Sequence, residues 1–161
     1  MKRCTITESC LTERGSSSPE ETEALGERFA RILKPGSVVA LKGGLGAGKT
    51  CFTRGVARAL GVAENVTSPT YTIVGEYAAR LDGRAIPLYH IDAYRLSGDE
   101  DFENTGAGEL VGQSAERAAG IAIIEWSERV PRSIPAEAIT VEIEITGPES
   151  RILRYHEPAR H

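Results

Sequence analysis

The stretch that decides the fold is residues 37–50, SVVALKGGLGAGKT. Its first half is a short apolar run rich in valine, which predicts a buried strand. Its second half, residues 43–50, fits the pattern G-x-x-x-x-G-K-[ST] at every position. A helix is expected to follow and to end near Gly61, with an inner face formed by Phe52, Val56, Ala59 and Leu60. A strand, a glycine loop and a helix in this order predict a loop that binds phosphate groups.

The residue types in this loop suit a nucleotide. Glycines let the backbone bend so that several N–H groups point at phosphate oxygens, and the positive end of the following helix adds to their attraction. Lys49 is expected to reach the β- and γ-phosphates, and the Thr50 hydroxyl to bind Mg²⁺. Cys51 is expected to pack as a small residue just inside the helix. The predicted nucleotide-binding residues of the loop are Gly43, Gly44, Leu45, Gly46, Ala47, Gly48, Lys49, Thr50 and Cys51.

Two acidic residues follow apolar runs farther along the chain. Asp92 ends LYHID, and Glu125 ends IAIIE. Phosphoryl transfer needs a carboxylate that holds Mg²⁺ and a group that orients the attacking nucleophile, and in such sheets these groups lie at the carboxyl ends of strands. We therefore predict Asp92 and Glu125, with Lys49, as the catalytic residues, and Thr50, Asp92 and Glu125 as metal ligands. The spacing does not decide which acid holds the metal and which orients water.

Other polar and aromatic residues have two interpretations each. Ser68 and Thr70, in NVTSPTYT, either close over a γ-phosphate or form an ordinary Ser-Pro turn. From the residues alone we expect His90 and Trp126 to lie in the core. Arg95 is expected to pair with the acids of SGDEDFE rather than to act as an arginine finger.

The flanking segments predict one α/β domain over residues 1–161, with a mixed sheet flanked by helices. We expect a short strand and then a loop, LTERGSSS (11–18), in the N-terminal part, with residues 1–15 partly disordered. A capping box of Ser18 and Glu21, with Pro19 in the first turn, predicts a helix up to Pro35-Gly36. The remaining strands are expected at 68–77, 85–91, 120–125, 138–146 and 151–156, with a hairpin turn at Asp82-Gly83.

The composition excludes several classes of protein. A net charge of -4 argues against a broad basic surface, so any nucleic acid is expected to act through a partner. The three cysteines form no CxxC pair, which is typical of free thiols in a reducing compartment. The start of the chain is too polar for a signal peptide, and no apolar run approaches the length of a membrane span. We expect a cytoplasmic protein that does not bind membranes.

Three classes of nucleotide-binding protein are considered, which differ in how they use the phosphate bond. A GTPase is excluded, because neither an Asn-Lys-x-Asp motif nor a D-x-x-G switch is present. A small-molecule kinase would need a lid and an acceptor pocket, for which the chain is short. An ATPase that acts on a partner fits best, with a metabolite kinase as the alternative.

Four segments in order, GGLGAGKT, SPTYT, HIDAYRL and IIEWSER, resemble the TsaE family of bacterial tRNA threonylcarbamoyladenosine biosynthesis. The resemblance extends from about Ser16 to the end of the chain. It implies a P-loop fold, ATP and Mg²⁺ as ligands, weak hydrolysis by the protein alone, and action through a TsaD–TsaB complex, with tRNA contacted only indirectly. SPTYT and HIDAYRL resemble two switch segments, which makes Ser68, Thr70, Tyr94 and Arg95 switch residues. The resemblance also places Trp126 near the nucleotide.

The chain departs from the family at Gly44, where the family commonly has an acidic residue. Any role of that carboxylate in holding metal water or orienting a nucleophile is therefore in doubt for this chain. A rival hypothesis from another class is a nucleotide-gated binding module, in which ATP orders the switch segments and hydrolysis is incidental.

Overall fold

The computed structural model of the chain describes residues 10–69, 71–111 and 120–157. A seven-stranded sheet has the strand order β1-β7-β6-β2-β5-β4-β3. Its strands are β1 (Cys10–Ser16), β2 (Val38–Lys42), β3 (Val74–Leu81), β4 (Arg84–Asp92), β5 (Ile121–Glu125), β6 (Ile139–Ile145) and β7 (Arg151–Glu157). The helices are α1 (Pro19–Phe29), α2 (Lys49–Ala59), α3 (Asp99–Asn104) and α4 (Ala107–Val111), with single 3₁₀ turns η1 (Ala30–Ile32) and η2 (Ser127–Arg129).

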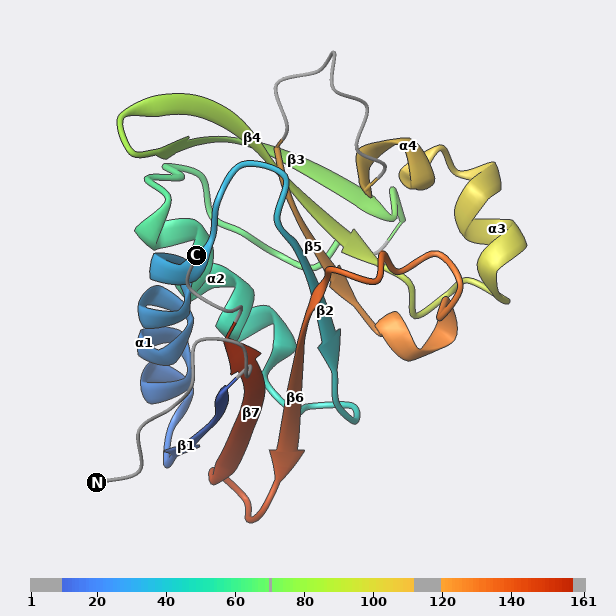
Figure 1. The fold of residues 1–161 in the computed structure, drawn as a ribbon. Helices are drawn as coiled ribbons and strands as arrows, with labels where there is room; N and C mark the ends of the chain where they lie inside the picture. The colour runs from blue at the N-terminus through green and yellow to red at the C-terminus, as the bar shows by residue number, and fades with distance from the viewer. Residues whose placement is uncertain (1–9, 70, 112–119, 158–161) are drawn as a thin grey trace.

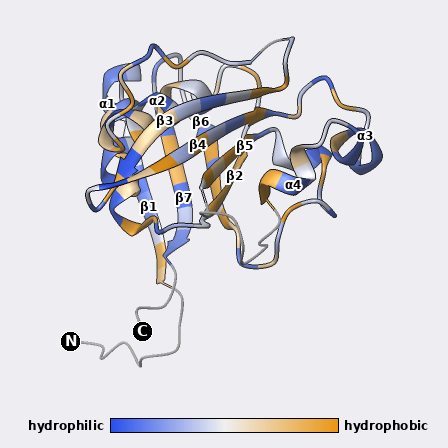
Figure 2. Ribbon diagram, turned by 90° about the horizontal axis from the view of Figure 1, so that it is seen from above, coloured by the Kyte–Doolittle hydropathy of each residue, from blue (hydrophilic) through white to orange (hydrophobic). Residues whose placement is uncertain are grey.

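The sheet is mixed, as the sequence predicted. Strands β4, β5, β2 and β6 are parallel neighbours at its centre, while β3, β7 and β1 pair antiparallel toward its edges. Helices α1 and α2 cover one face, and α3 and α4 lie on the other (Figure 1). Hydrophobic residues concentrate in the central strands β2 and β5 (Figure 2). Every residue of β5 is buried, which fits a strand covered on both faces.

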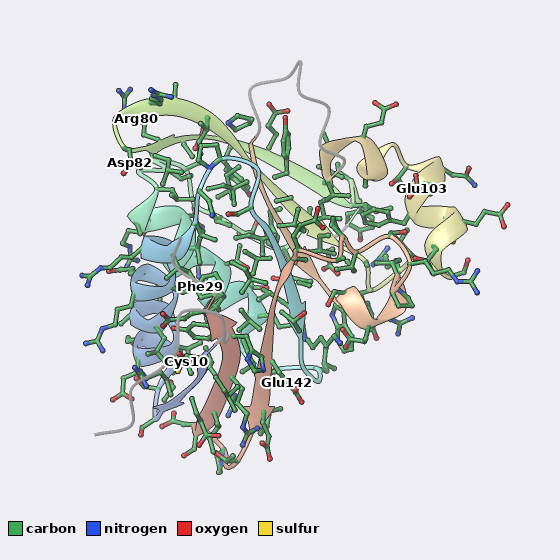
Figure 3. The ribbon with its side chains drawn as sticks, viewed as in Figure 1. Cys10, Phe29, Arg80, Asp82, Glu103 and Glu142 are labelled. Atoms are coloured by element: carbon green, nitrogen blue, oxygen red, sulfur yellow. The ribbon has the colours of Figure 1, made fainter. Side chains whose placement is uncertain are left out.

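Local sequence accounts for the first helix and its packing. The Ser18 side chain accepts a hydrogen bond from the Glu21 N–H at 3.1 Å, and Pro19 begins the helix, as predicted. Phe29, near the end of α1, packs its ring 5.2 Å from Phe52 of α2 and 5.0 Å from Tyr155 of β7, centroid to centroid (Figure 3). These contacts join the helix pair to the sheet.

The predicted hairpin is also present. Asp82 and Gly83, between β3 and β4, both have positive φ angles, 49° and 78°. That conformation matches the right-handed twist of two paired strands. Arg80 and Asp82 mark the tip of this hairpin (Figure 3).

Several sequence predictions were wrong in detail. Residues 11–16, expected in a loop, belong to β1, because pairing with β7 rather than an apolar pattern defines this polar edge strand. Residues 68, 69 and 71–73, expected in a strand, lie outside β3, and Ile73 has a φ of 64° that breaks the extended conformation. Ala59, expected on the inner face of α2, is exposed. The short helices α3 and α4 were not predicted.

Candidate functional site

The candidate site lies where three parallel strands end. Leu41 of β2 pairs with Glu125 of β5, and Glu125 pairs with Asp92 of β4, so the two predicted acids are neighbours across the ladder. The glycine loop leaves β2 at the same edge and enters α2. The structure therefore brings the predicted loop and both acids together, because parallel strands present their carboxyl ends at one edge.

The loop conformation depends on glycine at particular positions. Gly46 and Gly48 have φ angles of 77° and 98°, in the region that side chains rarely adopt. A Cβ on Gly43 would lie 2.8 Å from the backbone oxygen of Ile143, so β6 leaves no room for one. Gly44 is different: a Cβ there would meet nothing within 4 Å. Packing therefore does not require glycine at position 44, and an acidic side chain would fit there.

Lys49 is buried, with 6% of its surface exposed, at the first position of α2. Its Nζ donates hydrogen bonds to the carbonyl oxygens of Gly43 at 2.7 Å and Gly44 at 2.9 Å. The same Nζ lies 3.9 Å from the ring centroid of Trp126. Burial lowers the pKa of Lys49, while the carboxylates of Glu125, Glu128 and Asp92 act in the opposite direction. These contacts hold the ammonium against the inner side of the loop.

Glu125 connects the loop helix to β4. Its Oε1 accepts a hydrogen bond from the Thr50 hydroxyl at 3.0 Å and lies 3.0 Å from Nε2 of His90. His90 is fully buried, as expected of a core residue, but its contact with the acid was not anticipated. His90 and Asp92 are two residues apart on β4 and share a face, which is the signal that places both at this site.

Asp92 contacts Ser68, in the segment SPTYT that precedes β3. Its Oδ2 accepts a hydrogen bond from Ser68 Oγ at 2.6 Å, and its Oδ1 accepts one from the Tyr94 N–H at 2.9 Å. The structure thus brings Ser68 to the acid at the end of β4. Thr70, the other predicted hydroxyl of this segment, lies outside the described residues.

Aromatic and guanidinium groups surround the opening of the site. The Tyr94 and Trp126 ring centroids are 4.9 Å apart, and Arg129 lies 5.0 Å and 5.7 Å from the same two centroids. Trp126 is partly buried and packs against the core that contains Phe102 and Ile124, as the residues alone predict in part, and it also lies against Lys49, which they do not predict. Arg129, which completes the group, follows Trp126 by three residues and was missed by sequence reasoning.

Arg95 does not pair with the acids that follow it. Its guanidinium lies 4.9 Å from the ring centroid of Tyr71, and it forms no ion pair among the described residues. Asp101 instead accepts hydrogen bonds from Ser97, and Asp99 accepts them from Ser133. Asp101 is thus bonded within its own turn and Asp99 to the segment after η2, so the predicted pairing with Arg95 was wrong.

The oxygen atoms at this edge suit Mg²⁺. In the described part of the chain no group of three or more His, Cys, Asp or Glu residues is arranged to hold a metal. Mg²⁺ bound with a nucleotide needs fewer protein ligands, because one or two protein oxygens are joined by phosphate oxygens and water. Thr50 and Glu125, in direct contact, and Asp92 beside them supply such oxygens.

The central parallel strands, the glycine loop and the acids at the strand ends define an α/β domain of the P-loop type. The sequence comparison assigns it further. Residues 16–153 match the family described as threonylcarbamoyl adenosine biosynthesis protein TsaE, and the chain belongs to this family.

Known proteins resemble the chain over most of its length. The tRNA threonylcarbamoyladenosine biosynthesis protein TsaE of Treponema pallidum is 41% identical over 136 residues, which are 84% of this chain and 93% of the relative. The TsaE protein of Bacillus subtilis is 38% identical over 138 residues, covering 86% and 80% of the two chains. The crystal structure of Bacillus subtilis YdiB superposes with a TM-score of 0.69 at 33% identity and covers 93% of this chain and 87% of that one. The resemblance noted in the sequence is thereby confirmed, as is the fold class.

Within the described residues, no helix has both the length and the apolar character needed to span a membrane.

Proposed function

We propose that the chain binds and hydrolyses ATP as the nucleotide-dependent component of tRNA threonylcarbamoyladenosine formation, acting through a TsaD–TsaB-like complex. The relatives' names refer to this tRNA modification. The observation that carries the ATPase assignment is the contact of Glu125 with Thr50, directly beside the buried Lys49. In this proposal, ATP hydrolysis changes the state of the partner complex and yields no phosphorylated product other than inorganic phosphate and ADP.

Residues 43–50 bind the phosphates in this proposal. N–H groups of the loop and the start of α2 donate to phosphate oxygens, and Lys49 exchanges its carbonyl partners for the β- and γ-phosphates. The exchange offsets the desolvation cost of the buried ammonium, because a phosphate supplies the opposite charge. Trp126, beside Lys49, and Cys51 flank the bound nucleotide.

The two acids take different roles. Thr50 and Glu125 would hold Mg²⁺, since their oxygens already meet. Bound there, Mg²⁺ neutralises charge that develops on the β- and γ-phosphate oxygens. Asp92 orients the attacking water, and its hydrogen bond from Ser68 couples that task to the first switch segment. Ser68, Thr70, Tyr94 and Arg95 rearrange between nucleotide states and present that state to the partner complex, so tRNA is contacted only indirectly.

The test is ATP hydrolysis by the pure protein, measured with and without a purified TsaD–TsaB complex. We expect a slow rate alone and a sharp rise when the complex is added. The same mixture with the Lys49→Ala variant measures hydrolysis by the partner complex itself, which is then subtracted. A rate that is indifferent to the complex would contradict the proposal and favour a metabolite kinase, for which a phosphorylated acceptor would then be sought.

A second assay separates hydrolysis from nucleotide gating. Repeated rounds of tRNA modification are followed with ATP and with a non-hydrolysable ATP analogue. The proposal requires that the analogue supports at most one round. Sustained modification with the analogue would mean that ATP only orders the switch segments.

A further inference from the structure

A residue far from the loop in sequence holds the outer side of the glycine loop. Arg151, the first residue of β7, donates from Nε to the carbonyl oxygen of Ala47 at 3.1 Å and from Nη2 to that of Gly46 at 2.9 Å. The β6–β7 turn and the loop after β2 lie at the same end of the sheet (Figure 1). Lys49 binds carbonyl oxygens earlier in the loop, at Gly43 and Gly44, so two cations hold different parts of one loop.

The guanidinium of Arg151 is itself anchored. Its Nη1 donates to the carbonyl oxygens of Gly147 at 2.9 Å and Ser150 at 2.8 Å. The turn that carries these carbonyls is closed by a hydrogen bond from the Thr146 N–H to the Ser150 oxygen at 3.0 Å. A planar group with five N–H donors can bridge two such segments, whereas an ammonium presents its donors from a single point. Arg151 therefore connects the glycine loop rigidly to the β6–β7 turn.

The bridge has a consequence for the loop's N–H groups. In a trans peptide the C=O and N–H groups point to opposite sides. Holding the carbonyls of Gly46 and Ala47 toward Arg151 directs the N–H groups of Ala47 and Gly48 away from it. The Ala47 N–H is also held from within the loop, because it donates to the carbonyl oxygen of Gly44 at 3.1 Å. Gly46 and Gly48 allow other peptide orientations, so Arg151 is the contact that fixes these peptide groups from outside the loop.

We propose that Arg151 is a positioning residue of the phosphate loop, which keeps the peptide groups between Gly46 and Gly48 in the orientation that binds phosphate. This inference rests on the proposed nucleotide binding and adds a residue to that site. Removing the contact lowers the fraction of protein whose loop is competent, and the apparent affinity falls by the same factor.

The experiment compares substitutions on one strand. Arg151→Lys keeps the charge but not the fork, and Arg151→Gln removes both. The matched controls are Arg154→Lys and Arg154→Gln: Arg154 is three residues along β7, and its guanidinium pairs with Glu13 and Glu144 at 2.7 Å and 2.6 Å, away from the loop. Dissociation constants for Mg-ATP and Mg-ADP are measured by calorimetry, and the melting temperature of each variant is measured alongside.

We expect both Arg151 variants to bind nucleotide about tenfold more weakly than the wild type, as loss of a charge-assisted contact implies. The Arg154 variants should bind within about twofold of the wild type, even if their melting temperatures fall as much as those of the Arg151 variants. Hydrogen exchange at the amides of Gly46, Ala47 and Gly48 in nucleotide-free protein should be faster in the Arg151 variants only. A purely structural role would lower the melting temperature without this selective change.

Three results would overturn the proposal. Wild-type affinity in both Arg151 variants would show that the contact is irrelevant to binding. Normal affinity in Arg151→Lys with weak binding in Arg151→Gln would assign the effect to charge alone. Unchanged loop exchange relative to the Arg154 variants would show that the loop needs no bridge. If the wild type binds no nucleotide, the proposed function fails, while the exchange measurement still tests the bridge.

Discussion

The two sides of the candidate site are held together in different ways. The loop side comprises residues 43–50. Its Ala47 and Lys49 are buried, its Leu45 is 78% exposed, and its carbonyl groups accept hydrogen bonds from Lys49 and Arg151. The switch side comprises residues 68, 69, 71–73 and 92–95, in which Ala93 is buried, Tyr71 is 85% exposed and Tyr94 is 45% exposed. The loop is held by hydrogen bonds from two cations to its backbone, whereas the Tyr71 and Tyr94 side chains are held by contacts with aromatic and guanidinium groups. If the proposed function holds, the more tightly bonded loop side would bind the ligand and the switch side would report its state.

The two acids belong to different sides. Glu125 is 3% exposed and contacts Thr50 on the loop side, while Asp92 is half-buried and contacts Ser68 on the switch side. If the comparison holds, substitutions on the loop side affect binding, and those on the switch side affect hydrolysis and coupling to the partner.

The largest effect is expected for Lys49→Ala. Loss of a buried ammonium that meets two phosphates should weaken ATP binding by about a hundredfold or more and abolish partner-dependent activity. Binding is measured by calorimetry, and the exposed Lys42→Ala, at the end of β2, is the matched control and should bind within about twofold of the wild type. Equal affinities in the two variants would remove Lys49 from the site.

The acid pair should give the next largest effect. Glu125→Gln and Asp92→Asn are each expected to slow hydrolysis by about a hundredfold, the size typical of a lost catalytic carboxylate. They should differ in one respect: Glu125→Gln loses the increase in ATP affinity that Mg²⁺ gives, and Asp92→Asn keeps it. Binding with Mg²⁺ and with EDTA distinguishes them, and exposed Glu64→Gln is the control. The opposite pattern would exchange the roles of the two acids.

The sequence predicted the loop side better than the switch side for a physical reason. Strand, glycine loop and helix are local patterns, and parallel strands align Asp92 with Glu125 without further information. The contact of His90 with Glu125 does not follow from that alignment, because His90 pairs with Ile123 in the ladder and reaches Glu125 only through its side chain, which no local pattern specifies. The contacts of Arg95 and Trp126 were not predicted, because an exposed guanidinium and a partly buried aromatic ring each have several partners within reach.

A smaller effect is expected at His90. Its Nδ1 is buried and has no hydrogen-bond partner among the described residues, so Nε2 supplies its one polar contact, to Glu125. His90→Phe should slow hydrolysis about fivefold, because Glu125 loses a hydrogen bond worth about 1 kcal/mol that fixes its orientation. ADP affinity should change little, and His90→Gln, which restores a donor, should recover part of the rate. Single-turnover hydrolysis measures this, and no change in either variant would leave His90 as a packing residue.

The smallest effect is expected from Gly44→Glu, which tests whether the loop side needs a carboxylate of its own. The position is exposed, its φ lies outside the left-handed region, and an added Cβ meets nothing within 4 Å. The free energy of unfolding should therefore change by no more than about 0.5 kcal/mol. Because Asp92 and Glu125 already supply the acids, the partner-stimulated rate should stay within about threefold of the wild type, as an exposed charge is screened by solvent. Urea unfolding and the hydrolysis assay check both statements. A rate increase well beyond threefold would mean that the wild-type chain lacks a catalytic group on its loop side. The loop side would then take part in orienting water through position 44, in addition to binding the nucleotide.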